Sequence, residues 1–487
     1  GVARNLVTLS SVNAALYGVE FLNAASSNTV SIVYSTGGVH FDAAATYNTV
    51  SFSTVASSVL FQGDRNTLTD SRFLDEGSVI VFIAGANFNS VVRSTIVSVN
   101  SYAMNIGGSS NTVTDAYLRS DSGEAAIINA GSYNAISFST ISANSAGQRG
   151  LQIYGGANYN RLTASVVRNQ GTGVEIVTGA NFNTIAQSTV VSRGGDAIII
   201  NGVSSTTVVD SYVQGSTGVL VTNSTGTVVG GMIIIATGTG SSALWAGDGS
   251  VNLTVTSATI TAGFYGYGIR SENMGGLIRF TSNTISAGAA GVFIGTQAAN
   301  TQVWIGSMTV EVAGRGALGE VSAMRFDGLR TGATVYNSFV IARIGVSGTP
   351  TVYALRLLST NGILIKHSRF SMPDTLAAAN GSVMASFSNA VKTELINNDL
   401  YSERYSGTAL NRLLEVVNVS TGVKVTNNIF FSMWQTAGSS LTLVVDAGSQ
   451  SGFDSDYNDW FSSNTILSMM WGTTLTQGLA NWQATSG

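Results

Sequence analysis

The stretch NSVVRSTIVSVN, residues 89–100, decides the fold of this chain, because variants of its first eight residues recur before and after it. Such segments begin at Asn48, Asn66, Asn89, Asn111, Asn134, Asn160, Asn183 and Thr206. Successive starts lie 18 to 26 residues apart, and 23 is the commonest spacing. Self-similarity at such a period is typical of solenoids, in which one short unit stacks on the next and only the stack completes a core.

A second column lies five residues after these starts and continues much further along the chain. Its first members are Ser53, Ser71, Ser94, Ala116, Ser139, Ser165, Ser188 and Ser211. Ser10 and Val33 extend it upstream, and Gly231, Ser257, Ser282, Ser307, Ser338, Ser368, Asn398, Asn428 and Asn458 extend it downstream. The column predicts about nineteen coils.

Coil length changes along the chain. The spacing is about 23 residues up to Ser307, whereas the last five column members are 30 residues apart. We therefore expect one continuous solenoid with a regular short-coil part at residues 1–306 and a long-coil part with extended loops at residues 307–487.

Apolar residues alternate with polar ones in a way that suits strands. An apolar residue stands two positions after the column members, and we expect these residues to stack inward: Val55, Phe73, Ile96, Leu118, Ile141, Val167, Val190, Val213, Phe370, Leu400, Phe430 and Trp460. An Asn at the turn can hydrogen-bond to the Asn of the next coil and so satisfy buried amides along the stack. We expect this column at Asn48 to Asn183, and at Asn398, Asn428 and Asn458 in the last coils.

Composition agrees with an all-β chain and argues against several functions. The sequence has 56 Gly, 2 Pro, 44% hydrophobic and 10% charged residues, which suits short strands joined by polar turns. The net charge of −4 without a basic run argues against nucleic acid as a partner. Every apolar run is too short for membrane insertion. Cysteine is absent, which excludes disulfides and thiolate metal sites.

The ends of the sequence suggest an excerpt or a processed product. Gly1 leads directly into the first repeat at Asn5, without an initiator Met or a signal segment. Stacked coils leave unpaired strand edges that natural proteins cover. We therefore expect further copies or continuations of the same solenoid among its partners.

The repeat resembles a known group of proteins. The pattern N-x-V-x-x-S-x-I, with approaches such as GVEIVTGANFN (residues 173–183), is similar to bacterial right-handed parallel β-helix repeat proteins of the pectate-lyase-like superfamily, of the large surface or secreted type. DSDYNDWF (454–461) and GLANWQATSG (478–487) resemble the closing segment of such proteins. The resemblance implies a right-handed parallel β-helix and an extracellular or cell-surface location. It leaves function open, because this fold hosts lyases, hydrolases, adhesins and passive spacers.

Catalytic signatures of that superfamily are missing from the sequence. The NTD motif, the Asp-Asp pair, the Gly-His-Gly and the Arg-x-Lys of polygalacturonase-like hydrolases do not occur. Lys366, His367 and Arg369 form the best polar cluster for acid–base chemistry, although solvated strand residues explain them more simply. We predict no catalytic residue and no cofactor.

Three further patterns have structural explanations. Asp454, Asp456 and Asn458 have the spacing of calcium-binding loops, but Asn458 belongs to the structural column and no metal site is predicted. Aromatic residues precede the turn Asn at Tyr47, Phe88, Tyr133, Tyr159 and Phe182, and we interpret them as a packed corner stack. Outward Thr and Ser columns (Thr49, Thr67, Ser90, Thr112, Thr184 and Thr207; Ser51, Thr69, Thr114, Ser137 and Thr163) could bind ice or another flat surface, but other residues interrupt them.

The long-coil loops are the predicted ligand-binding surface. They bring Arg, Tyr and Trp residues, which are common in binding hot spots, to one corner of successive coils. The candidates are Arg315, Arg343, Asp374, Glu403, Arg404, Tyr405, Arg412 and Trp434, with Glu320 beside them. Our first hypothesis is a structural or adhesive module of a larger bacterial cell-surface or secreted protein that binds a polysaccharide or cell-surface glycan. A polysaccharide lyase or glycoside hydrolase is the alternative.

Overall fold

The structure, a computed structural model, describes residues 4–315, 320–330, 332–346, 351–373, 381–403, 411–433, 440–463 and 467–486. It describes only the backbone of residues 314, 315 and 344–346. The chain divides into two compact units, Gly1–Met232 and Ile233–Gly487. The predicted division at residues 306 and 307, which concerns coil length, stays a prediction.

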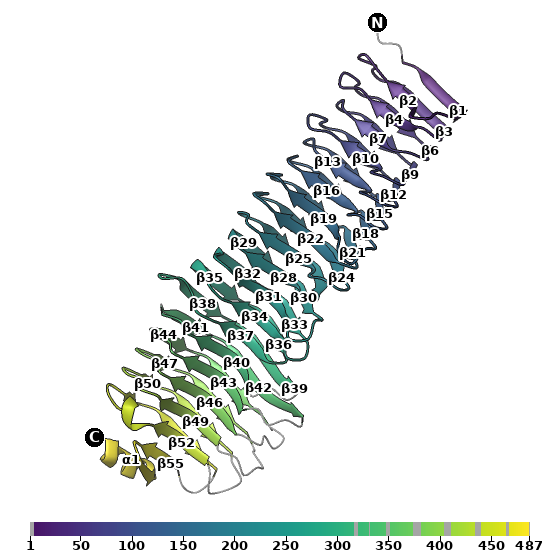
Figure 1. Cartoon of the computed structure of the whole chain (residues 1–487). Helices are drawn as coiled ribbons and strands as arrows, with labels where there is room; N and C mark the ends of the chain where they lie inside the picture. Colours follow the sequence, from purple (N-terminus) through teal and green to yellow (C-terminus); the bar gives the residue numbers. More distant parts are fainter. Residues whose placement is uncertain are drawn as a thin grey trace. The chain divides into compact units, whose positions relative to one another are not determined.

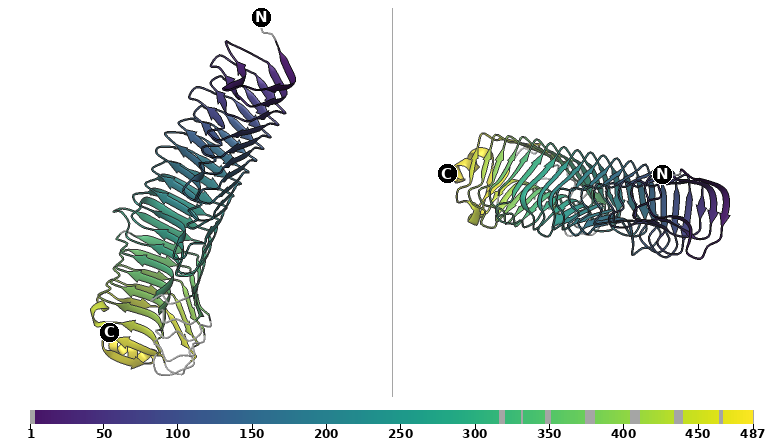
Figure 2. Two further views of the ribbon diagram at one scale, coloured as in Figure 1. Left: turned by 45° about the vertical axis from the view of Figure 1, so that its right-hand side comes forward. Right: turned by 90° about the horizontal axis from the view of Figure 1, so that it is seen from above.

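Each unit is a stack of coils with three strands per coil, and the chain is a right-handed parallel β-helix, as the repeat predicts. In one coil, β11 (Ser90–Val92) follows Asn89, β12 (Thr95–Ser98) follows Ser94, and β13 (Met104–Ile106) completes the coil. Each strand pairs in parallel with its counterpart in the next coil, so that three faces run along each unit, named first, second and third in this order. Figure 1 shows this layering within each unit, and Figure 2 shows it from two further sides.

In unit 1, β1 (Leu6–Val12) and β3 (Thr29–Ser35) span the first two faces. The first face continues with β5 (Thr49–Ser51), β8 (Thr67–Thr69), β11, β14 (Thr112–Thr114), β17 (Ala135–Ser137), β20 (Arg161–Thr163), β23 (Thr184–Ala186), β26 (Thr207–Val209) and β29 (Thr225–Gly230). The second face has β6 (Thr54–Val55), β9 (Arg72–Asp75), β12, β15 (Tyr117–Ser120), β18 (Thr140–Ala143), β21 (Val166–Asn169), β24 (Thr189–Ser192) and β27 (Tyr212–Gly215). The third face has β2 (Tyr17–Phe21), β4 (Gly38–Phe41), β7 (Val59–Phe61), β10 (Ile80–Phe82), β13, β16 (Ala126–Asn129), β19 (Arg149–Tyr154), β22 (Thr172–Val177), β25 (Ile198–Asn201) and β28 (Val219–Thr222).

Unit 2 repeats the arrangement with longer strands. Its first face has β32 (Val251–Thr256), β35 (Gly275–Thr281), β38 (Gln302–Gly306), β41 (Ala333–Tyr336), β44 (Ile363–Lys366), β47 (Glu394–Ile396), β50 (Lys424–Thr426) and β53 (Asp454–Asp456). Its second face has β30 (Ile233–Ala236), β33 (Thr259–Ala262), β36 (Thr284–Ala287), β39 (Thr309–Arg315), β42 (Phe339–Val346), β45 (Arg369–Met372), β48 (Asp399–Ser402), β51 (Ile429–Ser432) and β54 (Asp459–Ser462). Its third face has β31 (Ser242–Gly247), β34 (Tyr267–Ser271), β37 (Ala290–Ile294), β40 (Glu320–Asp327), β43 (Thr351–Leu358), β46 (Ser382–Ser388), β49 (Asn411–Val417), β52 (Ser440–Val445) and β55 (Ser468–Trp471).

The core follows the alternation of the sequence. Every second strand residue points inward, because side chains alternate across a strand. The predicted inward residues from Val55 to Val213, and Phe370, Leu400 and Phe430, are all buried. Trp460 departs from the prediction: it stacks on Phe430 at 3.9 Å but stays half-buried.

The predicted Asn column is a hydrogen-bonded ladder, which we call the Asn ladder. Its members are Asn5, Asn28, Asn48, Asn66, Asn89, Asn111, Asn134, Asn160 and Asn183. The backbone N–H of Asn89, for example, donates to Oδ1 of Asn111 at 2.8 Å, and Nδ2 of Asn111 donates to the Ala86 carbonyl at 3.0 Å. Asn398, Asn428 and Asn458 repeat the pattern in the last coils, as predicted.

The second column is also a ladder, but its predicted register is wrong over four coils. Between Ser53 and Ser211, serine Oγ atoms accept backbone N–H groups from the preceding coil, as Ser94 does from Ser71 at 3.2 Å. Farther along, the inward positions belong to Met232, Ala258, Asn283 and Met308, all buried. The predicted Gly231, Ser257, Ser282 and Ser307 stand one residue earlier, exposed at the corner with φ between 51° and 60°.

The last coil of unit 2 ends differently from the others. β55 pairs in antiparallel fashion with β56 (Thr474–Gln477), and the helix α1 (Leu479–Ser486) contacts both strands. Trp482 of α1 is buried and meets Phe453 and Trp471 edge to face. A 3-10 turn, η1 (Ala447–Ser449), precedes β53.

Candidate functional site

The third face of unit 2 gathers charged and aromatic side chains. Its strands pair in register, so that the outward residues of successive coils form one row. Successive residues of this row are about 4.8 Å apart, the spacing of neighbouring strands. Their sequence neighbours Leu244, Ile269 and Met324 are buried in the core, which fixes the outward direction of the row. The charged strip, as we call this surface, comprises Trp245, Tyr267, Arg270, Glu272, Phe293, Glu320, Arg325, Asp327, Tyr353, Arg356, Arg412 and Glu415.

Guanidinium groups cover aromatic rings along the charged strip. Arg270 lies 5.2 Å from the ring centre of Trp245 and 5.4 Å from that of Tyr267. Arg325 lies 5.4 Å from the ring of Phe293, and Arg356 lies 4.8 Å from the ring of Tyr353. These cation–π contacts hold the arginine side chains flat against the face.

Carboxylates pair with arginines of the charged strip, both within one coil and between coils. Glu320 pairs with Arg325 at 3.4 Å and also with Arg356 of the next coil. Arg325 reaches Asp327 at 2.8 Å. Farther along, Glu415 is buried and pairs with Arg412. Positive and negative groups of the charged strip thus pair with one another and hold one another in place.

Burial shifts the proton affinity of two groups in the charged strip. The half-buried position of Tyr353 raises the pKa of its phenol, and the nearby Glu415 carboxylate raises it further. Burial also lowers the pKa of the Arg356 guanidinium from its usual value. Perturbed groups of this kind concentrate at functional sites, although ion-pair networks also produce them.

A hollow of about 190 Å³ opens on the charged strip. Tyr265 and Tyr267 line it on one coil, and Glu320 and Arg325 line it two coils on. The small residues Ala289, Ala290 and Ser322 complete the lining. The hollow therefore combines aromatic rings with a paired carboxylate and guanidinium.

The described part of the chain contains only some of the predicted loop candidates. Asp374, Arg404, Tyr405 and Trp434 lie outside the described residues, and so does the side chain of Arg315. Arg343, on β42 of the second face, is exposed and pairs with Glu311 at 2.8 Å. Glu403 follows β48 at the same edge and is half-buried. Of these eight candidates, Arg412 belongs to the charged strip. Glu320, which the sequence analysis placed beside the candidates, belongs to it as well.

The cluster of Lys366, His367 and Arg369 lies at the corner between the first and second faces. Arg369 is exposed between two rings, 5.7 Å from Phe339 and 5.6 Å from Tyr401. His367 occupies the left-handed corner position with a φ of 51°. A shallow hollow of about 470 Å³ includes His367 and Arg369 but not Lys366.

The possible calcium ligands are strand residues of the last coil. Asp454 and Asp456 are exposed on β53, and Oδ1 of Asn458 accepts the backbone N–H of Asn428 at 2.9 Å. Asn458 therefore acts in the ladder. Among the described residues, no group of three His, Asp or Glu side chains is placed to hold a metal ion.

The corner aromatics of unit 1 stack on one another but stay exposed. Tyr133, Tyr159 and Phe182 form parallel stacks with centroid distances of 5.0 and 4.8 Å. Arg65 occupies the same corner one coil after Tyr47 and one before Phe88, and its guanidinium lies 5.7 and 5.1 Å from their rings. The predicted corner stack is therefore present from Tyr133 to Phe182, whereas Arg65 and not a ring lies between Tyr47 and Phe88. Ring faces inside the stack are covered. The neighbouring Thr and Ser columns bond to one another, as Thr112 does to Ser90 at 3.2 Å, and surface binding by them stays a prediction.

Sequence reasoning missed most of the charged strip. Its row recurs at Trp245, Arg270, Phe293, Arg325 and Arg356, 23 to 32 residues apart. The third-face strands carry no N-x-V motif. Their register therefore has to be inferred from the strands of the same coils on the first two faces. Stacking the coils on those faces would have placed the row in register.

Comparisons with known proteins agree on the fold. Residues 149–304 match the family model described as a right handed beta helix region. Curated proteins give no significant match. In the part of the chain that the structure describes, no helix has the length and apolar character for crossing a bilayer.

This chain is also similar to several solved structures. The Dettilon tailspike protein is 12% identical with a TM-score of 0.38; the alignment covers 76% of this chain and 62% of that one. The PL6 family alginate lyase AlyGC is 10% identical with a TM-score of 0.33, covering 94% and 98%. The tailspike of E. coli bacteriophage HK620, solved with a pentasaccharide, is 11% identical with a TM-score of 0.27, covering 95% and 74%. What these proteins bind or cleave is a property of those proteins.

Proposed function

We propose that this right-handed parallel β-helix serves as a glycan-binding module of a larger bacterial cell-surface or secreted protein. Its role there is structural or adhesive, and its ligand is a polysaccharide or cell-surface glycan. The observation that carries this proposal is the hollow on the charged strip, where Tyr265 and Tyr267 face Glu320 and Arg325.

The chemistry of that hollow suits a sugar. The apolar faces of a sugar ring pack on aromatic side chains, and its hydroxyl groups bond to planar donors and acceptors. Glu320 and Arg325 supply an acceptor and a donor that their mutual ion pair already orients. Binding therefore loses little side-chain entropy at these two groups. The loop residues Tyr405 and Trp434 stay part of the proposal.

The test is glycan binding by the full chain on an array, followed by titration calorimetry with the glycans that bind. Tyr267→Ala should lower the affinity about tenfold, as truncation of an aromatic hot spot does. Tyr154→Ala, on the third face of unit 1, is the matched control and should leave the affinity unchanged. Tyr405→Ala and Trp434→Ala test the loops. Equal binding by all these variants, or no glycan binding by the full chain, would overturn the proposal.

Polysaccharide cleavage is the second candidate, and the two perturbed groups favour it. Tyr353, with its raised pKa, and Arg356, with its lowered pKa, lie in contact beside the carboxylates of Glu320 and Glu415. A screen on acidic and neutral polysaccharides decides between the candidates. Turnover that disappears in Tyr353→Phe would make this chain an enzyme and replace the binding proposal.

A further inference from the structure

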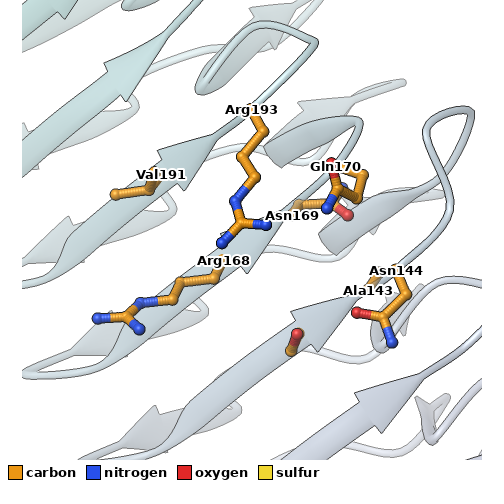
Figure 3. Close-up of a pocket in the computed structure, with 8 residues that line it drawn as sticks. Ala143, Asn144, Arg168, Asn169, Gln170, Val191 and Arg193 are labelled. Carbon is orange, nitrogen blue, oxygen red and sulfur yellow. The ribbon is translucent and has the colours of Figure 1, made fainter.

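A second hollow, of about 330 Å³, lies on the second face of unit 1. Ser142, Ala143, Asn144, Arg168, Asn169, Gln170, Val191 and Arg193 line it (Figure 3). In Figure 3 the Arg193 side chain extends over the coil of Arg168, with the amides of Asn169 and Gln170 at its side. The residues come from three successive coils, through β18, β21 and β24.

A local insertion borders this hollow. The coil that begins at Asn134 has 26 residues, whereas the coils that begin at Asn111 and Asn160 each have 23. β18 ends at Ala143 and β19 begins at Arg149, whereas their partners β21 and β22 are separated only by Gln170 and Gly171. The extra residues therefore lie between the second and third faces, beside Asn144.

Two arginines at the hollow lack the carboxylate partners that nearby arginines have. Arg119 pairs with Asp121, and Arg149 pairs with both Glu124 and Glu175. Asp121 also accepts a hydrogen bond from Asn144 at 2.7 Å, and Asp196 accepts the Thr217 backbone N–H at 3.1 Å. Arg168 and Arg193 are exposed and form no ion pair with any described residue.

We propose that this hollow is a second binding site, in which Arg168 and Arg193 bind the anionic groups of an acidic glycan. A guanidinium presents a planar fork of donors that matches a carboxylate or a sulfate ester, and the amide of Gln170 adds a neutral donor. The hollow extends over three coils, so an extended chain of acidic sugars can meet both arginines. The inference rests on the proposed function only in taking the ligand to be a glycan, because the site is separate from the charged strip.

The test uses the full chain with three oligosaccharide probes: one carrying uronate carboxylates, one carrying sulfate esters, and one neutral. Calorimetry at low and moderate salt should give binding of an acidic probe that weakens as salt rises. The carboxylate and sulfate arms identify which anion the site takes. Arg168→Gln combined with Arg193→Gln should weaken that binding at least about tenfold, because each charged hydrogen bond contributes substantially. Arg72→Gln, which removes an exposed arginine from β9 on the same face, is the matched control and should have little effect.

The variants distinguish the two proposed binding sites from each other. Loss of acidic-probe binding in the double variant, with Tyr267→Ala unaffected, supports this second site. Loss in Tyr267→Ala with the double variant unaffected leaves the charged strip as the only site and overturns this inference. Binding that Arg72→Gln weakens as much as the double variant does, or failure of both acidic probes to bind, also overturns it.

Discussion

At the scale of the residue, a buried amide explains why Asn recurs at the turn between the third and first faces. Asn111 accepts the Asn89 N–H, and its Nδ2 donates to the Ala86 carbonyl, all inside the core. A buried backbone N–H without a partner costs free energy comparable to a lost hydrogen bond. An amide side chain supplies both a donor and an acceptor in this space, which is why the Asn ladder could be predicted from the sequence.

Asn111→Ala should destabilise unit 1 by about 1–3 kcal/mol, because it leaves the Asn89 N–H and the Ala86 carbonyl without partners. The measurement is the midpoint of urea unfolding, together with hydrogen exchange at the Asn89 amide, which should speed up. Thr112→Ala removes an exposed hydroxyl from the next residue and should change stability by less than about 0.5 kcal/mol. Similar effects of both substitutions would contradict the role of the ladder.

The pair of Asp70 and Arg93 should make stability depend on acid pH. Two hydrogen bonds from Arg93, at 2.7 and 2.8 Å, and one from Thr69 lower the pKa of Asp70 from 3.8 to about 2. The folded state therefore binds this proton more weakly than the unfolded state, and the stabilisation is complete above pH 3.8 and is lost as the pH falls through about 2.

The thermal midpoint of Asp70→Asn should accordingly lie below that of the wild type near pH 5 and approach it as the pH falls to about 2. Asp115→Asn, at the same corner two coils on, is the control and should show a smaller gap. A gap for Asp70→Asn that stays constant over this range would contradict the ion-pair explanation.

At the scale of the element, the corners between strands explain why part of the structure could not be predicted from the sequence. Phe88 and Arg93 adopt left-handed backbone conformations, with φ of 58° and 44°, and their N–H groups bond to the next coil. This conformation is uncommon for such residues and has no signature in the motif. The register error at Ser257, Ser282 and Ser307 has the same origin, because an exposed corner serine looks in the sequence like a buried ladder serine.

The corner stack should stabilise unit 1 even though its rings are exposed. Tyr159 lies between Tyr133 and Phe182 with nearly parallel rings, so Tyr159→Ala removes two stacked pairs. We expect a loss of about 1–2 kcal/mol in urea unfolding. Phe138→Ala, which removes a ring that is 65% exposed at the other corner, should cost less. If both substitutions cost the same, the stack does not act as a structural element.

At the scale of the whole molecule, regular stacking made the architecture predictable and the site only partly so. The Asn and Ser columns recur in most coils of unit 1 because each coil meets its neighbours in the same way. The charged strip has no such requirement, since its outward residues touch solvent. Ligand binding or the ion pairs among its own residues determine which residues stand there. Only the register of the third face brings Arg325, Arg356 and Glu320 together.

The parallel pairing of successive coils also gives the molecule a mechanical character. Every coil is held to the next by similar hydrogen bonds. A pulling force on the two ends of the chain should therefore unfold the coils one at a time. Single-molecule extension should show a sawtooth whose steps release roughly 80 Å for a coil of 23 residues and roughly 105 Å for a coil of 30. One abrupt rupture of each unit would contradict it. A chain that yields in small steps absorbs work before it breaks, which suits a tether under shear.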